Sequence, residues 1–448
     1  MRTPRTRRGR RPAGLTAGLT AGLLAAALAL TACAQGGSAD TGGGATSDAA
    51  DPDEPVTIRW SWWGSDTRHT LTQEVIDLFE QKNPTITVVP DYTDWGSYFD
   101  KLSVSVAGGD APDVITQEER YLADYAAKGV LADLSALDVD TSKIDDTILQ
   151  SGTIDDAVYG IATGVNVYSV VADPQAFADA GVEMPDDTTW TWEDYVEIAN
   201  EITEKSGGAV YGAQDYGFNE PGFSILARQH DQSLYDEDGA LGFEPELLAQ
   251  WWQHSLDMQA AGGQPEAAKT VEVDAGGPEQ SLVGTNTGAM AWFWSNQLTA
   301  LANASGRPLQ LLRVPGESQF DRTGMYFKPA MYYSVSSRSE HPEAAAKLVD
   351  FLLNDPEAGA ILLSDRGLPA NTEVRAAVTE KFADTDKQAA EFLSSLEDEI
   401  VDGPVVPPVG AGQVTEIVKR LNAEVLFGRM TPQQAAEQFV QEVEAAIS

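Results

Sequence analysis

Ten tryptophans stand out among the residues that could bind a ligand. An indole ring can cover the C–H face of a pyranose, while planar Asp, Glu, Asn and Arg groups can each make two hydrogen bonds to the hydroxyls at its rim. A site built in this way rejects analogues that lack the hydroxyls. The ten tryptophans form the groups Trp60/Trp62/Trp63, Trp95, Trp190/Trp192, Trp251/Trp252 and Trp292/Trp294.

Core packing is the default role for several of these tryptophans. They fall in the middle of a predicted strand, in the first turn of a predicted helix or on an amphipathic helix, where a buried position is expected. This set consists of Trp60, Trp62, Trp192, Trp251 and Trp252.

Three tryptophans lie in loops or at strand ends, and they are the candidate platforms for a sugar ring. Trp63 ends the first strand before a Gly-Ser-Asp turn, and Trp95 lies in the polar and aromatic loop DYTDWGSY. Trp294 ends a later strand, GAMAWFW. Ligands of open α/β sheets bind beyond the carboxyl ends of the strands, which favours this choice. Core packing stays open as the alternative for Trp63 and Trp95.

Polar candidates for ligand contacts lie in loops, after predicted strands or in a segment expected to cross between lobes. Asp66 could instead cap the helix that follows it, and Glu118 could be an exposed loop acid. Arg366 could clamp hydroxyls with its planar fork or pair with a surface acid. The candidates are Ser65, Asp66, Glu118, Asn166, Tyr216 and Arg366.

The sequence lacks the motifs that mark several other kinds of functional site. The sequence has no Gly-Lys dipeptide for a P-loop and no Gly-x-Ser-x-Gly elbow. Its four histidines are far apart and it has one cysteine, so a zinc site has little to build on. We expect no metal and no cofactor. A carboxylate pair for glycoside hydrolysis is not a specific signal in a chain with 69 acidic residues.

The charge balance narrows the range of partners. The chain has 29 Lys and Arg against 69 Asp and Glu, a net charge of −40. Removal of residues 1–32 would take away six arginines and no acid, leaving a net charge of −46. So acidic a protein repels nucleic acids and anionic lipid surfaces, and we expect no nucleic-acid partner.

The first 33 residues have the features of an export signal. Six arginines precede a stretch rich in Ala, Gly and Leu, which Leu30-Thr31-Ala32-Cys33 follows. Threonines and glycines dilute the stretch and disfavour a permanent membrane span. Cys33 occupies the place of the lipidated cysteine in bacterial lipoprotein signals. We predict a signal peptide over 1–32, a lipid such as palmitate on Cys33, and a flexible tether over 33–54.

Strand and helix patterns alternate from residue 56 onward. This alternation indicates βαβ units around a parallel sheet, and therefore an α/β fold. Thr191 and Asp194 have the spacing of a capping box at the start of a later helix. The first predicted elements are a strand over 56–63, a helix over about 67–82, a strand over 86–90, a helix over 98–108 and a strand over 113–116.

Eight sequence motifs occur in a characteristic order. They are WSWWG, FEQKNPTITV, DWGSYFDKLSVSVAGGDAPDVI, YLADYAAKGVLADLSAL, YGIATGVNVYSVVADPQAFADAGVEMP, TWTWEDYVEIANEIT, GAMAWFWSN and HPEAAAKLVDFLLNDPEAGAILLSDRGLPAN. In this order, behind a lipoprotein signal, they resemble the sugar-binding members of extracellular solute-binding protein family 1, the receptors of ABC importers. The resemblance covers nearly all of the chain from residue 56.

The resemblance implies a periplasmic-binding-protein type II fold. Two α/β lobes would be joined by crossing hinge strands, with the ligand in the cleft between them. One lobe would contain residues 55–164 and 284–353, and the other 165–283 and 354–448.

The resemblance also implies a function. The chain would be a monomeric receptor on the extracytoplasmic face of the bacterial cell membrane, anchored through Cys33. It would capture a mono- or oligosaccharide by lobe closure and deliver it to the ABC permease, without being an enzyme. Some relatives in this family take a polyol or a glycerol-phosphate diester instead.

Two other functional classes stay open at this point. One is a secreted glycoside hydrolase, and the other is a surface protein that binds a polysaccharide without transporting it. A hydrolase barrel would show eight strand–helix repeats, whereas this sequence indicates two interrupted lobes.

Overall fold

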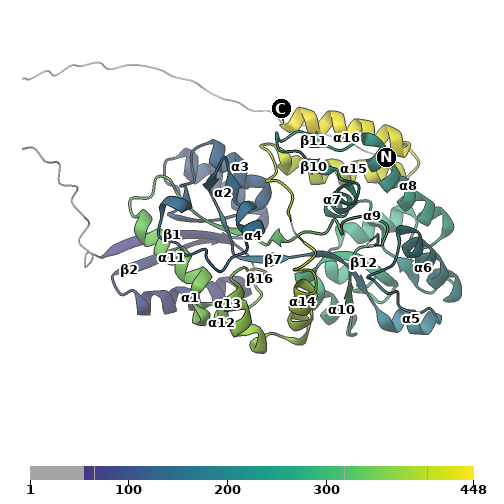
Figure 1. Ribbon diagram of the computed structural model, residues 1–448, viewed down its shortest axis with the longest axis horizontal. Helices are drawn as coiled ribbons and strands as arrows, with labels where there is room; N and C mark the ends of the chain where they lie inside the picture. Colours follow the sequence, from purple (N-terminus) through teal and green to yellow (C-terminus); the bar gives the residue numbers. More distant parts are fainter. Residues whose placement is uncertain (1–54, 65, 317, 401, 448) are drawn as a thin grey trace, which may run out of the picture. The chain divides into compact units, whose positions relative to one another are not determined.

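The computed structural model describes residues 55–64, 66–316, 318–400 and 402–447. Two sheets flanked by helices form most of this part, and a small third sheet connects them (Figure 1). The predicted signal peptide, Cys33, the tether over 33–54 and Ser65 lie outside the described residues.

The first sheet has the strand order β2-β1-β3-β15-β6. β1 (Val56–Trp63) pairs in parallel with β2 (Ile86–Thr93) and β3 (Val114–Gln117), as the βαβ pattern predicts. β15 (Tyr332–Val335) joins β3 and β6 (Ile161–Ala162) in antiparallel register. The larger helices of this lobe are α1 (Asp66–Lys82), α2 (Trp95–Ala107), α3 (Glu119–Ala127), α11 (Pro342–Asn354), α12 (Pro356–Leu362) and α13 (Thr372–Val378).

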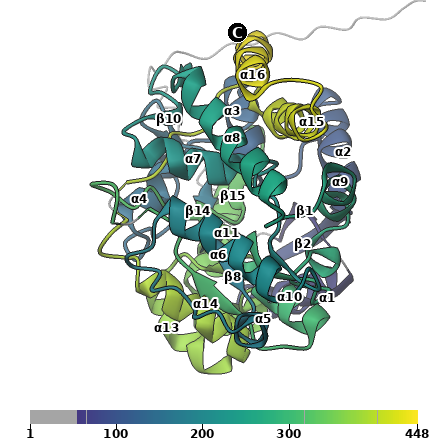
Figure 2. The ribbon, with the colours of Figure 1, turned by 90° about the vertical axis from the view of Figure 1, so that its right-hand side faces the viewer.

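The second sheet has the order β13-β8-β12-β9, with β13 (Gln310–Leu312), β8 (Tyr168–Ala172), β12 (Gly288–Trp294) and β9 (Tyr211–Ala213). Its helices are α5 (Pro174–Ala180), α6 (Trp192–Lys205), α7 (Glu220–Gln229), α8 (Pro245–Ala261), α9 (Ala267–Ala275), α10 (Leu298–Ser305), α14 (Asp384–Ser394), α15 (Val414–Leu426) and α16 (Pro432–Ile447). Figure 2 shows the C-terminal pair α15 and α16 beside α8. The predicted capping box of α6 is confirmed, because Thr191 and Asp194 exchange both bonds.

A three-stranded sheet of order β14-β7-β16 connects the two lobes. β7 (Gly164–Asn166) lies between β6 and β8 in the chain and pairs with β14 (Lys328–Pro329) and β16 (Leu368–Pro369). Gly164 is required there, since a Cβ atom would lie 2.5 Å from the Arg366 carbonyl oxygen and 2.6 Å from that of Leu368.

The strand pairing corrects the expected division of the chain. Residues 284–353 were expected to lie together in the first lobe, but β12 pairs with β8 and β9, and β13 pairs with β8. Only the part from β15 onward returns to the first sheet. Residues 354–448 are divided as well, because α12 packs on α1 of the first lobe whereas α16 packs on α8 of the second. Short apolar strands carry no signal for the sheet they join, which is why the sequence misplaced them.

None of the described helices combines the length and the apolar character needed to cross a bilayer.

Candidate functional site

A cavity of about 340 Å³ is lined by residues from both lobes. We call it the cleft. The first lobe contributes the residues that follow β3, the linking sheet contributes Lys328, and the second lobe contributes the end of β12 and the start of α7. A larger hollow of about 990 Å³ lies beside α8, α9 and β9 of the second lobe alone. We take the cleft as the candidate site because both lobes line it, at the carboxyl ends of β3 and β12.

Glu118 reaches the cleft because β3 ends one residue before it. It is the N-cap of α3, and its carboxylate accepts a hydrogen bond from the Arg120 backbone N–H at 3.0 Å. The carboxylate also accepts from Arg120 Nε, at 3.1 Å for each oxygen. The Glu118 side chain is therefore held in one orientation at the carboxyl end of β3, which pairs in parallel with β1.

Lys328 joins the carboxylates of the first lobe to the linking sheet. Its Nζ lies 3.0 Å from Glu119 Oε2 and 3.8 Å from Glu118 Oε1. Burial by itself would raise the pKa of Glu118, but Lys328 and Arg120 outweigh it and leave this pKa below its ordinary value. Burial likewise opposes the charge of Lys328, and Glu119 and Glu118 nevertheless raise its pKa. Glu118 and Lys328 are thus oppositely charged at neutral pH.

Glu220 faces this cluster from the second lobe. It begins α7, and its Oε2 accepts a hydrogen bond from Thr415 Oγ1 at 3.1 Å. Thr415 in turn accepts from Arg120 Nη1 at 3.3 Å, so a polar chain runs from α3 to α15 and α7 across the cleft. Burial raises the pKa of Glu220, against the lowering effects of Arg120 and of Thr415.

Trp294 is the predicted platform that lines the cleft. It ends β12 and is partly buried, with the Tyr168 ring 4.9 Å away between centroids. Lys328 Nζ lies 5.7 Å from the Trp294 ring centroid, within the range of a cation–π contact. The indole is therefore fixed by its neighbours and leaves its remaining surface to the cavity.

Trp63 and Trp95 lie together at the carboxyl end of β1, outside the cleft lining. Their rings pack edge to face, with centroids 5.0 Å apart. Trp63 is buried, whereas Trp95 is 42% exposed at the start of α2. β1 is the neighbour of β3, so this pair borders the strand that presents Glu118. Asp66 is exposed at the start of α1 and also lies outside the cleft lining.

Two other predicted ligand contacts lie inside the protein. Asn166 is buried on β7, opposite Lys328 in the strand register, and its Oδ1 has no hydrogen-bond partner in the described structure. Tyr216 is fully buried in the aromatic core of the second lobe, 4.4 Å from the Trp251 ring. Neither residue lines the cleft.

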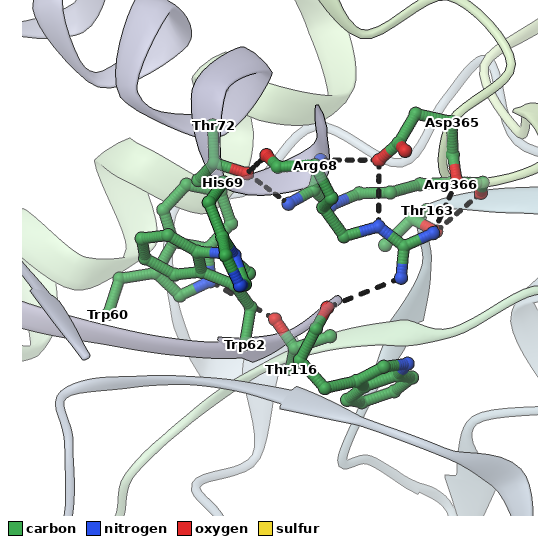
Figure 3. A network of polar contacts seen from close by, with 10 residues as sticks. Trp60, Trp62, Arg68, His69, Thr72, Thr116, Thr163, Asp365 and Arg366 are labelled. Atoms are coloured by element: carbon green, nitrogen blue, oxygen red, sulfur yellow. Dashed lines mark hydrogen bonds and ion pairs between the residues drawn. The ribbon is translucent and has the colours of Figure 1, made fainter. Parts of the chain in front are cut away.

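Arg366 is buried in the first lobe, also outside the cleft. Its side chain belongs to a network of polar contacts around α1 and β1 (Figure 3). Its Nη2 donates to Thr72 Oγ1 at 2.6 Å and its Nη1 donates to Asp365 at 3.2 Å. The guanidinium carbon lies 5.5 Å from the Trp60 ring centroid. The backbone carbonyl of Arg366 accepts from Thr163 Oγ1 at 2.9 Å, just before β7. Arg366 thus ties α1 and β1 to the linking sheet.

Sequence reasoning missed most of the charged residues of the cleft. Glu119 and Arg120 directly follow Glu118 and could have been found from the same strand end. Lys328 and Glu220 belong to segments distant in sequence, and no local pattern marks them. Within the described part of the chain, no group of three or more His, Cys, Asp or Glu residues could hold a metal ion.

Sequence comparisons extend over much of the chain. The family model of bacterial extracellular solute-binding proteins matches residues 64–359. An uncharacterized lipoprotein of Streptomyces antibioticus is 32% identical over 171 residues, which is 37% of each protein. A putative ABC transporter periplasmic-binding protein of Escherichia coli is 23% identical over 78% of this chain and 81% of its own length. An arabinooligosaccharide-binding protein of Halalkalibacterium halodurans is 26% identical over 44% of this chain and 43% of its own.

Solved structures agree on the fold. A family 1 extracellular solute-binding protein of Alicyclobacillus acidocaldarius superposes with a TM-score of 0.72 at 27% identity, over 89% of this chain and all of that one. An oligogalacturonide-binding protein of Yersinia enterocolitica gives a TM-score of 0.74 at 23% identity, over 88% of this chain and all of its own. The expected type II fold of two α/β lobes is confirmed. The chain belongs to the bacterial extracellular solute-binding protein family.

Proposed function

We propose that this protein captures a mono- or oligosaccharide outside the cytoplasm and delivers it to the permease of an ABC importer. The observation on which this rests is the cleft, in which an indole ring from one lobe faces hydrogen-bonding carboxylates from the other. Family membership supports a binding role. The names of the arabinooligosaccharide-binding and ABC-transporter relatives support the ligand class and the permease.

In the proposed mechanism the ligand is held by residues of both lobes. Trp294 stacks on the apolar face of a sugar ring, and Glu118 accepts hydrogen bonds from hydroxyls. Trp95, exposed near the carboxyl end of β1 and packed on buried Trp63, extends the first-lobe surface for a longer ligand. The lobes rotate about the linking sheet, as hinge closure in periplasmic binding proteins does. The closed form then presents a surface made of both lobes to the permease.

A thermal-shift screen with a panel of oligosaccharides tests this function. A ligand at 100 times its dissociation constant stabilises the folded state by about 2.7 kcal/mol, so a cognate sugar should raise the melting temperature. The screen should use the chain from residue 34 onward, without signal and cysteine. If no member of a broad panel stabilised the protein, carbohydrate capture would be contradicted.

We also propose that the protein binds its ligand without reaction. Glu118 and Glu220 have oppositely shifted pKa values, which is an arrangement that glycoside hydrolases use. Glu118, however, is already paired with Arg120 through both of its oxygens. Prolonged incubation with a stabilising oligosaccharide should therefore release no reducing ends. Release that Glu118→Gln abolished would identify a hydrolase instead.

The lipid anchor on Cys33 completes the proposal. An anchored monomer stays close to the permease, which raises its effective concentration there. Replacing Cys33 by Ser should release the protein from the membrane fraction into the medium, because the proposed lipid anchor is lost. The measurement is an immunoblot of membrane and medium fractions. Retention in the membrane fraction would contradict the anchor.

A further inference from the structure

We propose that the cleft selects an uncharged carbohydrate over its acidic counterpart, and that Glu220 sets this selectivity. The inference rests on the proposed function and names the class of sugar. It follows from the way in which the charged groups of the cleft are already paired with one another.

The cations of the cleft have carboxylate partners. Among the described residues that line the cavity, each lysine and arginine lies within 4 Å of an acidic side chain. A bound uronate would have to share one of these cations with a protein carboxylate, so that like charges would meet in a partly buried site. The pairs are Arg120–Glu118 at 3.1 Å, Lys328–Glu119 at 3.0 Å and Lys419–Asp274 at 3.4 Å.

Glu220 is the carboxylate in excess. Its hydrogen bond comes from the neutral hydroxyl of Thr415, and Arg120 uses its own donors for Glu118 and for Thr415. The lining residues therefore comprise four carboxylates and three cations. This surplus carboxylate faces the ligand from the second lobe, at the start of α7. Burial raises its pKa, and above that pKa it carries a negative charge.

The surplus charge discriminates between two kinds of ligand. Hydroxyl groups can donate hydrogen bonds to a carboxylate, and such charge-assisted bonds are stronger than bonds between neutral groups. A ligand carboxylate offers no donor at neutral pH and is repelled by Glu220. Because Glu220 is partly buried, the repulsion is screened less than at the open surface. We expect the acidic form of a ligand to bind about tenfold more weakly or worse, a difference of about 1.4 kcal/mol.

Matched pairs of oligosaccharides test this selectivity. Each pair shares a backbone and differs in charge: oligogalacturonides against their methyl esters, and glucuronans against cello-oligosaccharides. Titration calorimetry on the chain from residue 34 onward should show binding by uncharged members alone, or at least tenfold tighter than by their acidic partners. An acidic member that binds as tightly as its partner overturns the charge selectivity and leaves carbohydrate capture standing. If no member of any pair binds, the proposed function fails, and this inference fails with it.

Variants assign the selectivity to Glu220. Glu220→Gln should narrow the affinity ratio between uncharged and acidic ligands at least threefold, as should about 0.5 M NaCl for the unmodified protein. The matched control is Glu183→Gln, which removes the same net charge from an exposed position outside the cleft and should leave the ratio unchanged. Glu119→Gln serves as a second cleft variant if Glu220→Gln does not fold. An unchanged ratio in a folded Glu220→Gln protein overturns the assignment.

Discussion

Both lobes contain a cluster of aromatic rings, and the two clusters differ in whether their rings reach the protein surface. In the second lobe Trp192 and Trp292 stack 5.7 Å apart, and Trp251 packs edge to face on both. All three rings are buried, and we call this group the closed cluster. In the first lobe the cluster runs from buried Trp60 to half-exposed Trp95. Tryptophans occur in both clusters, so residue type does not decide which rings face a ligand.

Position along the strand accounts for the difference. Trp292 and Trp294 lie on one side of β12 and both line the cleft, but Trp292 is 2% exposed, whereas Trp294 is only partly buried because it ends the strand. Trp62 and Trp63 likewise lie at the end of β1, where the cluster reaches the surface through Tyr92 and Trp95. A strand's carboxyl end thus turns a core aromatic into a binding candidate.

The largest expected change is a loss of folding stability on substitution in the closed cluster. Replacing Trp251 by Ala should lower the free energy of unfolding by about 3–5 kcal/mol, because it leaves a cavity among Trp192, Tyr216 and Trp292. Urea unfolding followed by circular dichroism measures this. Trp95→Ala is the matched control, with a loss below about 1.5 kcal/mol expected at its half-exposed position. Equal losses in the two variants would contradict the contrast between the clusters.

A substitution of Arg366 tests whether this buried cation of the first lobe stabilises the fold or binds the ligand. Arg366→Ala removes the contact with Trp60 and leaves the Thr72 hydroxyl without its donor. We expect unfolding to become easier by about 1–3 kcal/mol. The affinity of the folded protein for its sugar should stay within about twofold. A large loss of affinity without loss of stability would restore the predicted role of Arg366 as a ligand clamp.

Trp294 should show the opposite behaviour. Trp294→Ala is expected to weaken sugar binding by about 1–3 kcal/mol, since aromatic burial against a ring is of this size. Its effect on unfolding should be smaller than that of Trp251→Ala, because Trp294 lies at the strand end. Calorimetry with the sugar found in the screen is the measurement. Unchanged affinity would remove Trp294 from the site.

The smallest expected effect is on the pH dependence of folding stability, and it comes from Asp215, a buried acid beside the closed cluster. It accepts hydrogen bonds from Ser255, from Asn422 at 2.8 Å and from Gln264 at 3.2 Å, yet burial raises its pKa. The folded state then holds a proton that the unfolded chain releases, so stability falls as the pH rises from the ordinary value near 3.8 through the raised pKa.

Asp215→Asn should remove this component of the pH dependence. Urea midpoints measured between about pH 4 and pH 7 should fall less steeply in the variant than in the unmodified protein. Asp238→Asn, at an exposed position, serves as the control and should keep the original slope. A slope unchanged by Asp215→Asn would contradict the raised pKa.

The sequence determined the local features of this protein. The βαβ order, the strand β1, the capping box of α6 and the burial of Trp60 and Trp251 follow from apolar spacing and short-range hydrogen bonding. Family membership likewise followed from motifs read in order. Glu118 and Trp294 could be placed at strand ends because Glu118 follows and Trp294 closes a predicted strand.

Only the tertiary structure decided which distant segments meet. It assigned β12 to the second sheet, brought Glu220 and Thr415 to Arg120, and put Lys328 between Glu119 and Trp294. It also buried Arg366, which the sequence placed in a polar loop. The physical reason is that strand pairing and charge pairing depend on distance in space, whereas periodicity and turn residues report only on neighbours along the chain.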